Sequence, residues 1–265
     1  MKLTRFLGLA MAGALSLSLL AGCGGDKGGA AASDLDKVQK AGKLNIGYTV
    51  YEPMNYTDAD GKFTGFDTEF AEAVCEKLGV EPNFVEINWD TKVVELDSGN
   101  IDCIWNGMTI TDDLKQNISI SNPYVQNKQV LVTLSKNKDT YADTANLKGK
   151  TVAVETGSAG QSVAEEDENL KDNLLTVGKQ TDALLEIQSG SADAAVFDWT
   201  LAQNMIGEGT DFSDLVIAAT LMDEQYGIGF RKDSDLCDKV NEIMAGLQED
   251  GTLSKLAEKY SLQLA

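Results

Sequence analysis

The chain has 265 residues, of which 42 are acidic and 22 are basic, so that its formal net charge is −20. This excess of acid argues against a nucleic-acid-binding protein, because phosphate binding needs a basic surface. The chain contains no histidine, which excludes Ser-His and Cys-His catalysis and removes the commonest zinc ligand. We therefore expect neither a metal site nor a cofactor.

The N-terminus has the pattern of a secretory signal. A basic start precedes an uncharged run at residues 6–21, which is shorter than the roughly 20 residues of a transmembrane helix. The run ends in Leu-Ala-Gly-Cys at 20–23 and resembles a bacterial lipoprotein signal. We expect residues 1–22 to be removed, lipid on Cys23 to anchor the chain outside the cytoplasmic membrane, and 23–33 to form a flexible tether. The alternative is an ordinary signal peptide with an incidental cysteine.

From residue 43 onward, short apolar runs alternate with stretches in which apolar residues recur at helical spacing. The first part predicts strands at 43–48, 82–87 and 101–105 and helices at 67–78 and 91–98. The second part predicts strands at 151–155, 174–177 and 194–198, helices at 182–189 and 199–206, another ending near 166, and helical residues at 234–260. Such alternation indicates parallel strands with helices on the sheet faces. Two similar units predict two lobes with a ligand cleft between them.

Three cysteines lie in the predicted folded part, at Cys75, Cys103 and Cys237. They are widely spaced and include no C-x-x-C pair, so that they indicate neither a metal site nor a redox pair. We expect buried free thiols, with one disulfide as the alternative.

Short motifs occur in a fixed order from about residue 43 to 260. The most informative are Tyr51-Glu52-Pro53-Met54-Asn55-Tyr56, Gly65-Phe66-Asp67, Asn106-Gly107-Met108-Thr109, Ser121-Asn122-Pro123-Tyr124 and Gly227-Ile228-Gly229-Phe230. Together they resemble the family 3 extracellular solute-binding proteins, which serve ABC importers of polar amino acids. The resemblance implies a type II periplasmic-binding-protein-like α/β fold, with a mixed sheet flanked by helices in each lobe. Lobe 1 would comprise 34–125 and 223–265, lobe 2 would comprise 126–222, and two hinge crossovers would lie near 125–128 and 222–226.

The same resemblance implies which side chains hold an amino-acid ligand. Asp198 matches the acid that pairs with the α-ammonium, a contact that charge-assisted hydrogen bonds would strengthen. Tyr51 and Trp89 match two aromatic residues that enclose the ligand side chain. The alternatives are that Asp198 caps the following helix and that both aromatic residues serve only in packing.

Other matching positions are polar or small. Asn106, Gly107 and Thr109 match a loop that offers backbone and hydroxyl groups to the ligand, where glycine permits close approach. Ser158 lies at a predicted helix start, where backbone N–H groups favour an anion, although it also suits a plain helix cap. Trp105 is expected in the core, with a place on the cleft wall as the alternative.

At one position the chain departs from the family pattern. Leu114 replaces the arginine that usually binds the α-carboxylate with two hydrogen bonds, a loss of roughly 2–5 kcal/mol for a buried carboxylate. Ala159 also replaces a common hydroxyl residue. Either Lys115, Asn106 and the turn at Ser158 hold the carboxylate differently, or the ligand has no ordinary α-carboxylate. In the second case Glu52 and Glu155 would favour a cation.

These features together predict a lipid-anchored, monomeric substrate-binding component of an ABC importer, with permease and ATPase subunits as partners. We expect it to capture a small amino-bearing solute, most simply an amino acid, with a cationic amine as the alternative. A dehydratase-type enzyme on the same fold is a weaker alternative, with Glu52, Glu155 or Asp198 as the general acid or base.

Overall fold

The computed structural model describes residues 33–265. The predicted signal peptide, the lipidation at Cys23 and nearly all of the predicted tether lie outside these residues. Among the described residues, no helix is both long enough and apolar enough to cross a membrane.

Most predicted elements are present with boundaries shifted by only a residue or two. The helices are α1 (Asp34–Ala41), α2 (Phe66–Leu78), α3 (Lys92–Asp97), α4 (Asp112–Asn117), α5 (Lys138–Tyr141), α6 (Ala159–Glu166), α7 (Gln180–Ser189), α8 (Trp199–Met205), α9 (Asp235–Glu249) and α10 (Thr252–Lys259). The strands are β1 (Lys43–Tyr48), β2 (Tyr56–Thr57), β3 (Phe63–Thr64), β4 (Glu81–Glu86), β5 (Cys103–Thr109), β6 (Ser119–Ile120), β7 (Val125–Leu134), β8 (Val152–Glu155), β9 (Leu174–Val177), β10 (Ala194–Asp198) and β11 (Leu215–Phe230).

One nine-stranded sheet connects most of the described chain, in the order β4-β1-β5-β11-β7-β10-β8-β9 with β6 beside β11. The two ends of this order are parallel, as predicted, because β1 pairs with β4 and β5, and β8 pairs with β9 and β10. The centre is antiparallel, where β11 pairs with β5 and β7. The strand directions therefore give the mixed α/β architecture that the sequence resemblance implies.

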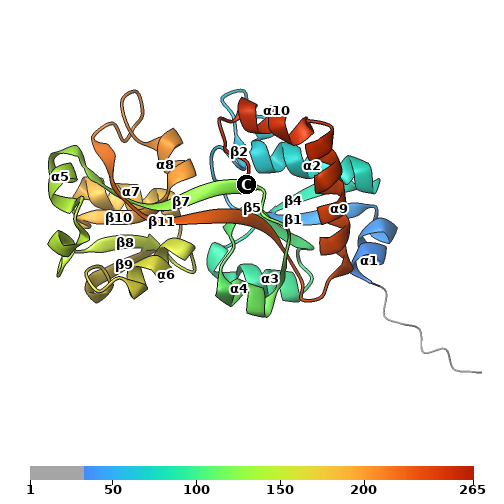
Figure 1. Ribbon diagram of the computed structural model, residues 1–265, viewed down its shortest axis with the longest axis horizontal. Coiled ribbons are helices and arrows are strands. Elements are labelled where there is room, and N and C mark those ends of the chain that lie inside the picture. The colour runs from blue at the N-terminus through green and yellow to red at the C-terminus, as the bar shows by residue number, and fades with distance from the viewer. Residues whose placement is uncertain (1–32) are drawn as a thin grey trace, which may run out of the picture. The chain divides into compact units, whose positions relative to one another are not determined.

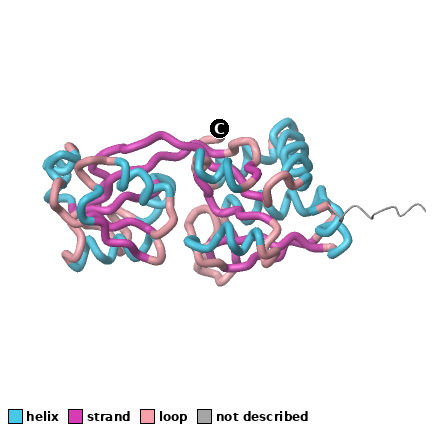
Figure 2. Tube along the Cα trace, turned by 90° about the horizontal axis from the view of Figure 1, so that it is seen from below, coloured by secondary structure: helices cyan, strands magenta, loops and turns pink. Residues whose placement is uncertain are grey.

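Strands β7 and β11 are the long elements that join the two ends of the sheet (Figure 1). Helices α2, α9 and α10 gather near β1 and β4, whereas α6, α7 and α8 gather near β8 and β10. The turned view shows the same two long strands between the two groups of helices (Figure 2). The predicted crossovers pair with each other, with Asn127 opposite Glu224 and Lys128 opposite Asp223. Our sequence analysis predicted these stretches only as crossovers and did not predict the long strands.

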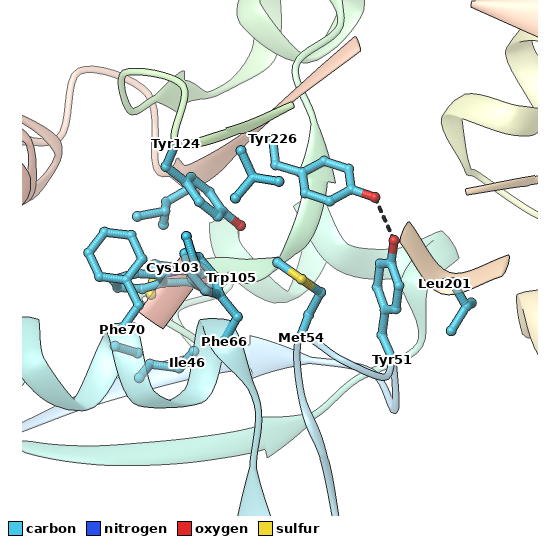
Figure 3. Close-up of a cluster of buried hydrophobic side chains, with 14 of the residues drawn as sticks. Ile46, Tyr51, Met54, Phe66, Phe70, Cys103, Trp105, Tyr124, Leu201 and Tyr226 are labelled. Atoms are coloured by element: carbon cyan, nitrogen blue, oxygen red, sulfur yellow. Dashed lines mark hydrogen bonds between the residues drawn. The ribbon is translucent and has the colours of Figure 1, made fainter. Parts of the chain in front are cut away.

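The main core contains a set of aromatic side chains beneath β1 and β5 (Figure 3). The ring of Trp105 is fully buried there and meets Phe70 edge to face at 4.9 Å between centroids. Aromatic pairs prefer this geometry, and burial of such large side chains dominates core energetics. Trp105 is thus a core residue, as expected from its apolar strand.

The three thiols of the described chain, at Cys75, Cys103 and Cys237, are free and buried. The expectation of buried free thiols is confirmed, and the alternative of a disulfide is wrong. Burial raises the pKa of the Cys75 thiol to about 12 and that of Cys237 to about 11. Both thiols therefore stay protonated and unreactive in the folded protein.

Candidate functional site

A cavity of about 530 Å³ lies between residues from the two ends of the sheet. Most of the residues that we predicted for the site line it, namely Tyr51, Trp89, Asn106, Gly107, Thr109, Leu114, Glu155, Ser158, Ala159 and Asp198. The volume suits a small ligand, since ligand pockets typically measure about 300–1,000 Å³. The tertiary structure therefore brings together positions that are up to 147 residues apart in the chain.

Asp198 provides a buried carboxylate at the end of β10. Its Oδ1 accepts hydrogen bonds from Asn127 Nδ2 at 2.9 Å and from Gln129 Nε2 at 2.6 Å, and its Oδ2 accepts one from Gln180. Asp198 occupies the N-cap position of α8, as the alternative predicted, but its side chain makes no capping hydrogen bond there. Burial raises the pKa of Asp198, although these hydrogen bonds oppose the shift. No cationic side chain of residues 33–265 forms an ion pair with it.

Glu224, which our sequence analysis missed, lies beside Asp198. The amides of Asn127 and Gln129 also donate to Glu224 Oε1, at 2.5 and 3.0 Å, and Thr109 Oγ1 donates to the same oxygen at 3.0 Å. Glu224 belongs to β11, and only the pairing of β11 with β7 places it here. The sequence signal for Glu224 was its position just before the motif at residues 227–230. This signal was weak, because the sequence analysis did not predict strand β11.

Tyr51 forms part of the cavity wall and is held by a second tyrosine. Its hydroxyl lies 2.5 Å from the hydroxyl of Tyr226, and the two rings meet edge to face (Figure 3). Gly107 has a φ of 57°, and a Cβ there would lie 2.8 Å from the Tyr51 ring. The backbone N–H of Gly107 donates to Asp67 Oδ2 at 2.6 Å. Glycine is therefore required both by the backbone conformation and by the close approach of Tyr51.

We predicted that the segment with Asn106, Gly107 and Thr109 forms a loop. This prediction is wrong, because the segment is the second half of β5. Antiparallel pairing with β11 extends this strand beyond the apolar run. The side-chain amide of Asn106 donates to Thr49 O and to Asn55 Oδ1, each at 2.8 Å. These internal bonds indicate that Asn106 positions the wall of the cavity.

Lys92 supplies a buried positive charge that our sequence analysis missed. Its Nζ donates to Gly157 O at 2.8 Å and to Trp89 O at 3.2 Å, and it lies 4.7 Å from the centre of the Trp89 ring. Burial lowers the pKa of Lys92. The three-residue spacing after Trp89 was the available signal, because residues at i and i+3 share a helix face. The other lysine of the lining, Lys179, is exposed and lies 3.5 Å from Glu86.

Neither Leu114 nor Lys115 contributes a positive charge to the cavity. Leu114 packs against the apolar cluster that contains Trp89 and Ile104. Lys115 Nζ pairs with Asp112 at 2.9 Å on the surface, with its side chain 55% exposed. Lys115 does not line the cavity, because its one-residue offset from Leu114 on the helix turns its side chain away. Its position therefore gives no support to the alternative in which Lys115 helps to hold a ligand carboxylate.

The opposite wall carries a helix start and a carboxyl group. Ser158 is the N-cap of α6, and its Oγ accepts from Gln161 N at 3.1 Å. The hydroxyl hydrogen of Ser158 stays available to an anion, and Ala159 is the first residue of the helix. Glu155 ends β8, where burial and the charge of Asp198 raise its pKa to about 8.

Two residues that we considered for the site lie elsewhere. Trp105 belongs to the core and does not line the cavity, because its side chain points to the α2 face of the sheet (Figure 3). Glu52 is exposed and borders a separate hollow near α8 and α10. Glu52 directly follows Tyr51 in the turn, but the two side chains lie on opposite sides of it.

The sequence profile of the bacterial extracellular solute-binding proteins, family 3, matches residues 44–263. The chain therefore belongs to this family. It is an extracellular or periplasmic solute-binding protein and not an enzyme.

Several known proteins resemble the chain over nearly their whole length. The L-cystine-binding protein TcyJ of Escherichia coli strain K12 is 31% identical over 267 residues, which cover 98% of this chain and 97% of TcyJ. A mutant of the T. maritima protein ArgBP has a TM-score of 0.78 at 33% identity, with 86% of this chain and 98% of that chain covered. A Streptococcus pneumoniae ABC substrate-binding protein with bound histidine has a TM-score of 0.78 at 29% identity, with 86% and 96% covered.

Proposed function

We propose that this protein is the substrate-binding component of an ABC importer and that it captures an amino acid in the cavity beside Asp198. The observation that carries the proposal is the Asp198 carboxylate, which lines the cavity and is oriented by three amides without a cationic partner among the described residues. A ligand ammonium would supply the missing charge through charge-assisted hydrogen bonds. Relatives that bind cystine, arginine or histidine support this proposal.

Capture would occur by closure of two lobes, formed by residues 34–125 with 223–265 and by residues 126–222. The chain would cross between them where β7 pairs with β11, near Lys128 and Asp223. A few residues at such crossings can absorb a hinge motion. The bond from Lys92 Nζ to Gly157 O would stabilise the closed form, because it joins α3 to the turn before α6.

The ligand carboxylate would bind between Lys92 and Ser158. Lys92 is the buried cation of the cavity lining, and two of its three N–H groups already bind backbone carbonyls. The third N–H and the Ser158 hydroxyl would then contact the carboxylate. This arrangement would replace the two-bond contact of an arginine with a single-point charge.

A cationic amine without a carboxylate is the second candidate ligand. Glu155, Asp198 and Glu224 are buried in or beside the cavity, and none forms an ion pair with another described residue. Asp198 carries a negative charge, and Glu155 and Glu224 would add two more if a bound cation displaced their protons. Three such groups near one buried lysine favour a ligand with more positive than negative charge. This candidate predicts binding of amines that match the amino acids in all but the carboxylate.

A thermal-shift screen of residues 24–265 tests both candidates. The probes are the common amino acids, L-cystine and the decarboxylated amines agmatine, cadaverine and histamine. A ligand at about 100 times its Kd stabilises the folded protein by about 2.7 kcal/mol, which is readily detected. Asp198→Asn should remove the shift, and it should also lower the melting temperature without ligand modestly, because the new amide nitrogen would face one of the three amide donors that now bind the carboxylate. An unaltered shift in this variant would refute the assigned ammonium contact.

We also propose that lipid on Cys23 tethers the protein to the outer face of the cell membrane, next to permease and ATPase subunits. The motif at residues 20–23 supports this anchor, and two acyl chains would suffice for stable attachment. Cys23→Ser should release the protein in soluble form. Retention of this variant in the membrane fraction would refute the lipid anchor.

A further inference from the structure

Glu224 and Asp198 share the same hydrogen-bond donors. Asn127 Nδ2 lies 2.9 Å from Asp198 Oδ1 and 2.5 Å from Glu224 Oε1. Gln129 Nε2 lies 2.6 Å from the first oxygen and 3.0 Å from the second. Two amide groups therefore hold both carboxyl groups side by side, one from β10 and one from β11.

Nothing among the described residues neutralises this pair. Glu224 is 8% exposed and Asp198 is 5% exposed, and neither forms an ion pair. The second oxygen of Glu224, Oε2, is buried and has no hydrogen-bond partner. Two adjacent carboxylates cannot both remain charged in such a place, because desolvation and mutual repulsion oppose it.

We propose that Glu224 is the second acid of the ammonium site, that it holds a proton when no ligand is bound, and that it releases this proton when a cationic group binds beside Asp198. The O–H bond of the Glu224 carboxyl breaks, and the proton passes to the solvent buffer. No covalent bond to the ligand forms. The inference rests on the proposed function, since it assumes that the cavity takes a cationic group.

The surroundings of Glu224 support this protonation. Burial, followed by the charge of Asp198, raises the pKa of Glu224 to about 9, although Asn127 and Gln129 oppose the shift. The hydroxyls of Tyr51 and Tyr226 also lie in the field of both acids, and burial raises the pKa of each well above 10. They stay neutral and add no charge.

Two other buried ionisable groups line the same cavity, Glu155 on β8 and Lys92 on α3. Glu155 interacts with the charges of both Asp198 and Lys92. Because the pKa of Glu155 is raised as well, only the comparison with Glu224→Gln assigns a released proton to the acid pair.

Proton release makes binding depend on pH in a defined way. At pH values below the pKa of Glu224, each rise of one pH unit should lower the Kd of a cationic ligand by up to about tenfold, because one proton is released for each ligand bound. Glu224→Gln imitates the neutral form at every pH. Its Kd should match that of the wild type near pH 6.5 and should exceed it by roughly tenfold or more near pH 8.5.

Isothermal titration calorimetry tests the inference with L-arginine and agmatine as probes, which differ only in the carboxylate. The measured proton release is corrected for ionisation of the ligand amine, because the ammonium is the group that we assign to Asp198. Titrations in buffers of different ionisation enthalpy give the number of protons released per ligand. The wild type should release up to one proton more than Glu224→Gln at pH 7.5. Glu208→Gln, a change at an exposed loop residue, is the control and should behave as the wild type does.

Equal proton release by wild type and Glu224→Gln would overturn the inference while leaving the proposed function intact. Failure of both probes to bind would count against the proposed choice of ligand instead. In that case ¹³C NMR of the glutamate carboxyls in the wild type decides the question without ligand. A Glu224 signal that titrates above pH 7 supports the inference, and one that titrates near the ordinary value of about 4.3 overturns it.

Discussion

Replacement of Lys92 by methionine should weaken binding of amino acids far more than binding of the matching amines. The substitution keeps an apolar stem beside Trp89 and removes the charge that we assign to the ligand carboxylate. Because Leu114 provides no alternative charge, nothing else in the buried lining would compensate. The comparison of a carboxylate-bearing ligand with its decarboxylated form isolates this one contact.

Two contributions to the loss can be separated from the structure. The bond from Lys92 Nζ to Gly157 O, 2.8 Å long, would stabilise the closed form by about 1.5–3 kcal/mol because its donor is charged, and its loss affects every ligand equally. A charged hydrogen bond to the ligand carboxylate contributes about 1.5–3 kcal/mol. The second contribution corresponds to a roughly 10- to 150-fold change in Kd for the amino acid alone.

The assay is calorimetric titration of the wild type and Lys92→Met with L-arginine and agmatine at one pH and ionic strength. The ratio of the two Kd values should change by at least about tenfold in the variant. Lys179→Met is the matched control, because Lys179 lines the cavity but is exposed and pairs loosely with Glu86. An equal loss for both ligands in Lys92→Met would mean that Lys92 acts only in closure, and our assignment of the carboxylate would be wrong.

Three further predictions concern the described chain. Leu114→Arg should lower the Kd of an amino acid, relative to the Kd of its decarboxylated amine, by about tenfold or more. If calorimetry finds that the ratio of these two Kd values does not change, an arginine at this position does not reach the ligand carboxylate. Burial raises the pKa of Asp67 to about 7. Between about pH 4 and pH 7 the folded state therefore keeps a proton that the unfolded state has lost. The free energy of unfolding should fall over this range by up to about 1.4 kcal/mol for each rise of one pH unit. Asp67→Asn should flatten this slope in urea denaturation, and an unchanged slope would assign the effect to other acids. The thiols of Cys75, Cys103 and Cys237 should react with Ellman's reagent only after unfolding; fast reaction of the native protein would show that one of them is accessible.

The sequence predicted most of the regular structure because local patterns are sufficient for it. The apolar run at 43–48 and the helical spacing at 67–78 predicted β1 and α2 within one residue. Alternation of such segments required parallel strands, and the sheet contains them. The boundary of β5 was wrong, because its pairing with β11 continues through Thr109, beyond the apolar run.

The sequence also determined the family, and three positions that we predicted for the ligand, Asp198, Tyr51 and Trp89, line the cavity. Only the tertiary structure decided the charge of the site. Glu224 reaches Asp198 through the pairing of β11 with β7, and Lys92 reaches Gly157 across 65 residues of chain. The physical reason is that burial and the distances between ionisable groups set their protonation, and neither can be read from the local order of residues.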